Sequence, residues 1–157
     1  MKRAFATVAM VLAFGVSMTA CDSDPTGVDP RDVTFAAELE IDLDAMTRSS
    51  SGLYHQDLEV GTGATALPGR IVGVLYRGWL ADGTLFDQRQ DPGDPFYFGL
   101  GAGSVIDGWE EGVAGMRVGG VRKLVIPPSL GYGDRPNGPI PPNSVLVFEV
   151  QLMSVDS

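Results

Sequence analysis

Few residues in this chain of 157 amino acids have the types and spacing that catalytic sites need. The one histidine, His55, has no cysteine or second histidine beside it, whereas zinc and related metals take several nitrogen or sulfur ligands. No partner for a serine or cysteine nucleophile is evident, so acyl transfer is not indicated. If this chain is an enzyme, its reaction therefore needs no metal and no strong base.

Two glycine-rich stretches resemble phosphate-binding loops but lack the structural context of one. Residues 61–66, GTGATA, fit the pattern G-x-G-x-x-A, yet Pro68 and Gly69 prevent the helix that must follow. Gly101-Ala102-Gly103 fails because Ile106 occupies the third glycine position. Both stretches are therefore interpreted as loops, and a nucleotide site is not expected.

Aromatic side chains are the chemical resource that remains. Each one taken alone is more simply explained as part of a hydrophobic core, because aromatic residues supply much of the buried area of a core. Together they could also line an apolar pocket, and their sequence contexts decide between these interpretations. They are Tyr76, Phe86, Phe96, Phe98, Trp109, Tyr132 and Phe148.

The elements that must position these rings are mostly strands. Apolar residues alternate along residues 71–80, 96–100, 121–126 and 146–152, which predicts strands with one buried face. Turn signals stand at Asp82-Gly83, Pro92-Gly93 and Asn137-Gly138. Only Val105 to Val113 has a helical pattern, so we expect an antiparallel sheet curled around one short helix.

That helix is unusually rich in glycine. Residues 103–120 read GSVIDGWEEGVAGMRVGG, and each glycine inside a helix costs about 1 kcal/mol relative to alanine. Gly108, Gly112 and Gly115 therefore predict that another element approaches the helix backbone closely, or that something sits on its start.

Three stretches in order carry a family resemblance: VLYRGWLADGTLFD, PFYFGLGAGSVIDGWEEGVAGMRVGGVRKLVIPPSLGYGD and PIPPNSVLVFEVQLMSV. From about Gly52 to Val155 the chain closely resembles the FKBP-type peptidyl-prolyl isomerases. The resemblance implies an α+β fold, in which a strongly bent antiparallel β-sheet wraps around one short α-helix with a hydrophobic pocket between them. It implies no cofactor and no metal.

The resemblance also implies roles for individual residues. Trp109 would form the pocket floor and hold the proline ring with Phe96 and Phe148, while the backbone N–H of Ile106 would anchor a substrate carbonyl. Ile140 would overhang the rim. The expected catalytic residues are Tyr76, Phe86, Asp87 and Tyr132, and the expected substrate-binding residues are Phe96, Val105, Ile106, Trp109, Ile140 and Phe148.

The chain departs from the family pattern after Phe86-Asp87. The family usually has two serines there and then an arginine that pairs with the aspartate, whereas this chain has Gln88, Arg89, Gln90, Asp91 and Pro92. Either Arg89 serves as that partner, or Asp87 is oriented otherwise. Asp87 could also be an ordinary turn or surface carboxylate. The loop between Tyr132 and Ile140 is about one residue short.

Two functions stay open at this point. The first is an isomerase for proline-containing peptides and unfolded client proteins, with macrolide immunosuppressants as further partners by resemblance. The second is a binding or chaperone module with the same fold and little turnover. A nucleic-acid partner is not expected, because the net charge is -9 and phosphate binding relies on lysine and arginine.

Residues 1–20 have the layout of a bacterial lipoprotein signal peptide, with Lys2 and Arg3 before a mostly apolar run. Ser17-Met18-Thr19-Ala20-Cys21 resembles a lipobox, which would make Cys21 the lipidated first residue of a protein anchored in the bacterial cell envelope. The alternative is an uncleaved membrane anchor with an incidental thiol. Asp22 resembles an inner-membrane retention signal of some bacteria, so either membrane remains open.

The remaining chain divides into residues 21–51 and an isomerase domain at residues 52–157. Residues 22–34 are polar and contain two prolines and a glycine, as a flexible tether would. Residues 35–48 fit both a helical and a strand pattern, and extended structure is the preferred interpretation. The cluster Ser49-Ser50-Ser51-Gly52 then predicts a break before the domain.

Overall fold

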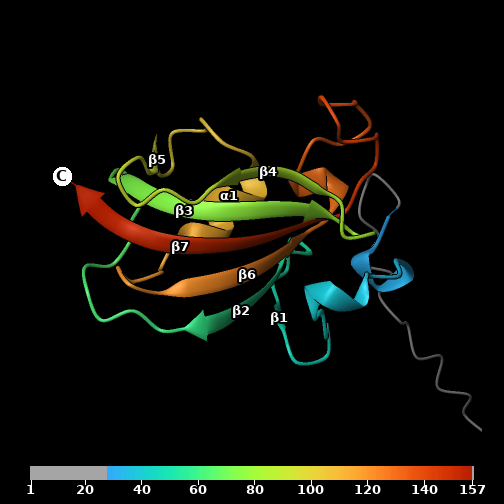
Figure 1. Cartoon of the computed structure of the whole chain (residues 1–157), viewed down its shortest axis with the longest axis horizontal. Coiled ribbons are helices and arrows are strands. Elements are labelled where there is room, and N and C mark those ends of the chain that lie inside the picture. The colour runs from blue at the N-terminus through green and yellow to red at the C-terminus, as the bar shows by residue number, and fades with distance from the viewer. Residues whose placement is uncertain (1–27, 157) are drawn as a thin grey trace, which may run out of the picture.

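A computed structural model describes residues 28–156, and within them one antiparallel sheet wraps around one α-helix. The helix, α1 (Asp107–Val113), lies behind β3 and β7 in Figure 1. The predicted α+β fold with a single short helix is therefore confirmed. The described strands are β1 (Thr47–Arg48), β2 (Tyr54–Glu59), β3 (Ile71–Leu80), β4 (Leu85–Arg89), β5 (Phe96–Gly99), β6 (Val121–Ile126) and β7 (Leu146–Asp156).

The sheet order β1-β2-β6-β7-β3-β4 places the longest strands, β3 and β7, side by side. β5 pairs with the first half of β3, and β4 pairs with the second half of β3. β4 and β5 therefore lie along the same edge of β3. The predicted turns at residues 82–83, 92–93 and 137–138 all occur. Short 3-10 helices at Pro30–Asp32, Ala37–Leu39 and Pro128–Leu130 complete the described elements.

Glycines let α1 pack directly on β6. A Cβ atom added at Gly108 would lie 2.5 Å from Cγ2 of Ile126, and one added at Gly112 would lie 2.7 Å from Cδ1 of Leu124. Both distances are shorter than real contacts, so a larger residue at either position would force the helix or these side chains to move. The helix cost of the two glycines is offset by this close approach.

The main core fills the space between α1 and the inner face of the sheet. Trp109 and Val113 of the helix meet Leu124 and Ile126 of β6 there. Further buried members are Leu53, Ala66, Val72, Val74, Phe98, Leu100, Met116, Ile140, Leu146, Phe148, Val150 and Leu152.

A second core covers part of the outer face of the sheet. Cross-strand partners Tyr54, Val125, Val147 and Trp79 form a row across four strands. Leu39 and Met46, which are 5% and 8% exposed, pack on this row. In this region both faces of the sheet are buried. The prediction of a single buried face for each strand was therefore incomplete.

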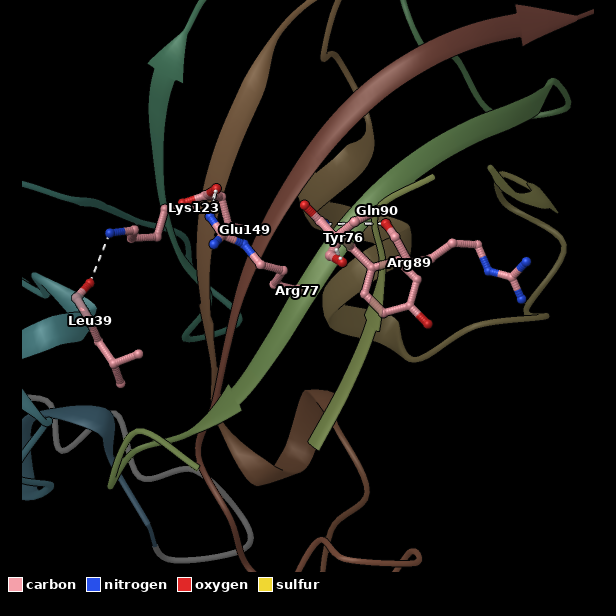
Figure 2. A network of polar contacts seen from close by, with 7 residues as sticks. All are labelled: Leu39, Tyr76, Arg77, Arg89, Gln90, Lys123 and Glu149. Carbon is pink, nitrogen blue, oxygen red and sulfur yellow. Dashed lines mark hydrogen bonds and ion pairs between the residues drawn. The ribbon is translucent and has the colours of Figure 1, made fainter. Parts of the chain in front are cut away.

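We call residues 28–46 the strap, because they lie across this outer face. Figure 1 shows the strap in blue and cyan beside the end of β3, where the Ala36 N–H donates to the Ala81 carbonyl at 2.8 Å. The buried Lys123 Nζ donates to the Leu39 carbonyl at 2.8 Å (Figure 2). The strap is therefore held by hydrogen bonds as well as by apolar contacts.

The preferred interpretation of residues 35–48 as extended structure was wrong for most of the segment. It contains the 3-10 helix Ala37–Leu39, a turn at residues 43–45 and only two strand residues, Thr47–Arg48. Glu40 has a φ of 50°, which interrupts both helix and strand. The described part of the predicted tether also departs from a flexible spacer, since Asp29 caps a short helix and pairs with Arg48 at 3.5 Å.

The predicted signal peptide and Cys21 lie outside the described residues. Within residues 28–156, no helix combines the length and apolar character that crossing a bilayer requires.

Candidate active site

A cavity of about 240 Å³ opens between α1 and the inner side of β3, β4, β5 and β7. Nine of the ten residues predicted from the sequence line it, and Ser104 is an additional lining residue. The nine are Tyr76, Phe86, Asp87, Phe96, Val105, Ile106, Trp109, Tyr132 and Phe148.

Trp109 forms the floor, and rings from three strands surround it. Its centroid lies 4.9 Å from that of Tyr76 and 5.3 Å from that of Phe148, both in edge-to-face geometry. Phe98 and Phe96 follow at 5.7 and 6.0 Å. Such ring pairs add about 0.5 to 1.5 kcal/mol each beyond the area they bury. The floor is therefore built of closely packed aromatic rings.

Gly78 explains how Phe86 and Phe148 meet across β3. Their rings pack edge-to-face at 5.5 Å, and a Cβ atom at Gly78 would lie 2.6 Å from Phe148 Cε1 and 2.8 Å from Phe86 Cζ. Only glycine leaves room for this contact. The pattern Tyr76-Arg77-Gly78 thus places one ring on the inner face and makes space for two others.

Tyr76 and Asp87 supply the polar wall. The Tyr76 hydroxyl donates a hydrogen bond to Asp87 Oδ2 at 2.7 Å. Burial raises the pKa of Tyr76 above its ordinary value, and the hydrogen bond to Asp87 raises this pKa further. The phenol therefore stays protonated at neutral pH and keeps its donor role.

Arg89 is not the partner of Asp87, so that alternative was wrong. Arg89 forms an ion pair with Asp94 in the loop before β5. The next residue, Gln90, donates from Nε2 to the Tyr76 carbonyl at 2.8 Å, as Figure 2 shows. Asp87 is therefore held by Tyr76, and β4 is joined to β3 at its end by a glutamine side chain.

Ile106 stands at the start of α1 with its N–H available to a ligand. Its carbonyl accepts hydrogen bonds from the N–H groups of Trp109 and Glu110, at 2.9 and 3.1 Å. No acceptor for the Ile106 N–H is found among residues 28–156. The role of this N–H as the anchor for a substrate carbonyl stays a prediction.

Ile140 was wrongly placed at the rim by the sequence interpretation. It is 4% exposed, belongs to the main core and does not line the cavity. Asn137 and Ile140 exchange two backbone hydrogen bonds, at 2.9 and 3.0 Å, which closes a tight turn. This short loop directs Ile140 inward. Ser104 lines the cavity but was not predicted from the sequence. Its position directly before Val105, a predicted site residue, could have indicated it.

His55 lies on β2, opposite Thr47 and Leu124, and does not line the cavity. Burial lowers its pKa, and the nearby Arg122 guanidinium lowers it further. Among the described residues, no three His, Cys, Asp or Glu side chains are grouped in a way that could hold a metal ion.

Known proteins are similar to this chain in sequence and in fold. The family model of FKBP-type peptidyl-prolyl cis-trans isomerases matches residues 63–153. An FK506-binding protein of Neisseria meningitidis serogroup B is 48% identical over 105 residues, which cover 66% of this chain and 96% of that protein. The chain therefore belongs to the FKBP-type peptidyl-prolyl cis-trans isomerase family.

Solved structures agree with this assignment. Escherichia coli FkpA is 44% identical with a TM-score of 0.66, and the match covers 71% of this chain and 52% of that one. An isomerase from Pseudomonas syringae pv. tomato is 34% identical with the same TM-score of 0.66, and the match covers 77% and 87% of the two chains. The chain thus spans about half of FkpA but most of the Pseudomonas and Neisseria proteins.

Proposed function

We propose that this protein accelerates rotation about X-Pro peptide bonds in client proteins outside the cytoplasm. It does so by non-covalent stabilisation of the twisted amide. The observation that carries the proposal is the aromatic pocket itself, in which four rings surround Trp109 and a small number of polar groups stand at the wall.

The energetics suit such a pocket. Rotation crosses a barrier of about 18 to 20 kcal/mol because it removes amide resonance, and uncatalysed rotation takes roughly tens to hundreds of seconds. Acceleration by about 10⁴ to 10⁵ requires only ~5.5 to 7 kcal/mol of transition-state stabilisation. A twisted amide is less dipolar than a planar one, so a dry aromatic site favours it over the ground state.

Each part of the pocket has a role in this mechanism. Trp109, Phe96 and Phe148 hold the proline ring of the substrate. The free Ile106 N–H binds a carbonyl of the substrate backbone. Tyr76, Phe86 and Asp87 surround the rotating carbonyl. Tyr132, which is half-exposed at the rim, donates to the peptide.

The same pocket defines the partners. Peptides with a large apolar residue before proline fit best and acidic peptides worst, because the pocket is apolar and the chain has a net charge of -9. Unfolded chains that expose such sequences are the natural clients. The names of the Neisseria and fungal relatives identify them as FK506-binding proteins, which supports macrolide binding in this pocket.

The alternative is a lipid-anchored module that binds proline peptides with little turnover. One observation favours it: Asp87 forms no ion pair with another described residue, since Arg89 is engaged by Asp94. The contribution of the Asp87 carboxylate to turnover therefore needs a direct test.

Replacement of Asp87 tests its catalytic role. We expect Asp87→Ala to lower kcat by at least about tenfold, because the carboxylate faces the rotating carbonyl, with a change in stability within roughly 0.5 kcal/mol. The measurement is a protease-coupled assay on a Leu-Pro peptide, together with thermal unfolding. Asp94→Ala is the matched control, since it removes an equal charge outside the pocket. An Asp87→Ala protein with the kcat of the wild type would show that this carboxylate takes no part.

We further propose that Cys21 is lipidated and that residues 1–20 are removed. Removal takes away Lys2 and Arg3 and no acidic residue, so nine basic residues remain against 20 acidic ones and the net charge becomes -11. From Cys21 to the strap at Val28 the chain can reach at most about 25 Å. This short link from Cys21 to Val28 therefore keeps the domain near the bilayer, although anionic headgroups repel the negatively charged domain.

Fractionation tests the anchor. We expect the wild-type protein in membrane fractions, released only by detergent, because two or more acyl chains hold stably. Cys21→Ser should remain unprocessed, which mass spectrometry of the N-terminus detects. A Cys21→Ser protein cleaved like the wild type would exclude the proposal, as would a wild-type N-terminus without lipid mass.

A further inference from the structure

The loop at residues 100–104 connects the buried Leu100 to the pocket wall, and its residues 101–104 have little apolar packing of their own. Residues 101–104 are exposed, and Gly101 and Gly103 both have positive φ, at 83° and 68°. A Cβ atom at Gly103 would meet nothing within 4 Å. This loop nevertheless leads directly into Ser104, Val105 and Ile106, which line the cavity.

One carboxylate fastens this loop to the helix. Glu110 Oε2 accepts a hydrogen bond from the Gly101 N–H at 2.5 Å, and Glu110 Oε1 accepts one from the Gly103 N–H at 2.8 Å. Hydrogen bonds to an ionised acceptor are roughly twice as strong as neutral ones. The other bonds of the loop backbone are at its base and at Ala102. At the base, the Leu100 N–H donates to the Arg70 carbonyl and the Leu100 carbonyl accepts from the Gly69 N–H, both at 2.8 Å, while the Ala102 N–H donates to the Gly99 carbonyl at 3.3 Å.

The place of Glu110 on α1 gives these bonds a consequence for the site. The preceding residue, Trp109, is the pocket floor, so adjacent residues of one helix hold the floor and the wall. The Ile106 N–H lies at the end of this wall, and the Val105–Ile106 peptide plane sets its direction. A loop free to move would change the direction of that N–H and the width of the pocket.

We propose that Glu110 is a positioning residue for substrate binding. It fixes the 100–104 loop through its two backbone hydrogen bonds, and thereby holds Ser104, Val105 and the Ile106 N–H in the geometry that receives the peptide. Glu110 acts through this loop and does not touch the substrate. The inference rests on the proposed function, because it assigns the same pocket to the peptide.

The test compares two neighbouring glutamates. Glu110→Ala removes both bonds, whereas Glu110→Gln retains one acceptor oxygen. Glu111→Ala is the matched control, because Glu111 lies on the same helix with the same charge and accepts instead from the Ser51 hydroxyl at 2.7 Å. The measurements are KM and kcat for a Leu-Pro peptide, the affinity for the same peptide by titration, and hydrogen exchange of the Gly101 and Gly103 amides.

We expect Glu110→Ala to raise KM and weaken peptide affinity about tenfold, with kcat changed less than twofold and with faster exchange of both glycine amides. Glu110→Gln should fall between Glu110→Ala and the wild type, and Glu111→Ala should keep the wild-type KM. Unchanged affinity in a folded Glu110→Ala protein, with exchange either accelerated or unchanged, would overturn the proposal. A wild-type protein that binds the peptide without turnover would contradict the isomerase function alone, since affinity and exchange still test Glu110.

Discussion

Trp109→Ala is expected to abolish measurable peptide binding and to lower the free energy of unfolding by about 3 to 5 kcal/mol, as large aromatic residues do when truncated in a core. Trp109 is 4% exposed and contacts the rings of Tyr76, Phe96, Phe98 and Phe148, so its removal leaves a cavity under the whole pocket. Substrate and transition state should lose binding alike, because both need the floor. Chemical denaturation and peptide titration measure the two effects.

The control for this result is an aromatic residue at the rim. Tyr132 is 36% exposed and lines the same cavity, so Tyr132→Ala should weaken catalysis with a loss of stability below about 1 kcal/mol. The account would be contradicted if Trp109→Ala retained wild-type affinity for a Leu-Pro peptide. It would also be contradicted if the two substitutions cost equal stability.

Removal of the strap is expected to have the second large effect. A protein that begins at Ser49, which also lacks β1 (Thr47–Arg48), should be less stable than one that begins at Val28 by about 3 to 6 kcal/mol. This estimate rests on the burial of Leu39 and Met46, at about 1.5 to 3 kcal/mol each.

Catalysis should respond differently from stability in this comparison. The pocket lies on the inner face of the sheet and the strap on the outer face, so kcat/KM per folded molecule should change less than about twofold. Leu39→Ala in the longer protein provides a graded control. Equal stability of the two proteins would support the start of the domain predicted at Gly52 and show that the strap does not stabilise the fold.

The sequence predicted the pocket better than it predicted the outer face. Alternating apolar residues identified β3, β5, β6 and β7, since each places one set of side chains on the main core. Within β6 and β7, the runs Leu124-Val125-Ile126 and Leu146-Val147-Phe148 are also apolar at the positions between the alternating ones, and all six residues are buried. A continuous apolar run signals a strand buried on both faces. That signal was present and would have predicted a cover such as the strap.

Other features depend on contacts that no local pattern contains. β2 and β4, with the sequences YHQDLE and LFDQR, are largely polar or exposed, so they have little apolar periodicity and are recognised by their pairing with β6 and β3. Arg89 has three acidic neighbours in the sequence, Asp87, Asp91 and Asp94, and only the path of the loop before β5 decides that Asp94 is its partner. The inward direction of Ile140 likewise follows from a turn closed by Asn137.

The central claim is that the pocket accelerates rotation and does not merely bind proline. Exchange NMR on a Leu-Pro peptide tests this most directly, because it observes the cis and trans resonances of the same molecule at equilibrium. With the protein at a small fraction of the peptide concentration, we expect exchange between these resonances at several per second or faster, against roughly tens to hundreds of seconds without it. Resonances that shift on binding while exchange stays at the uncatalysed rate would contradict the isomerase account and favour the binding module.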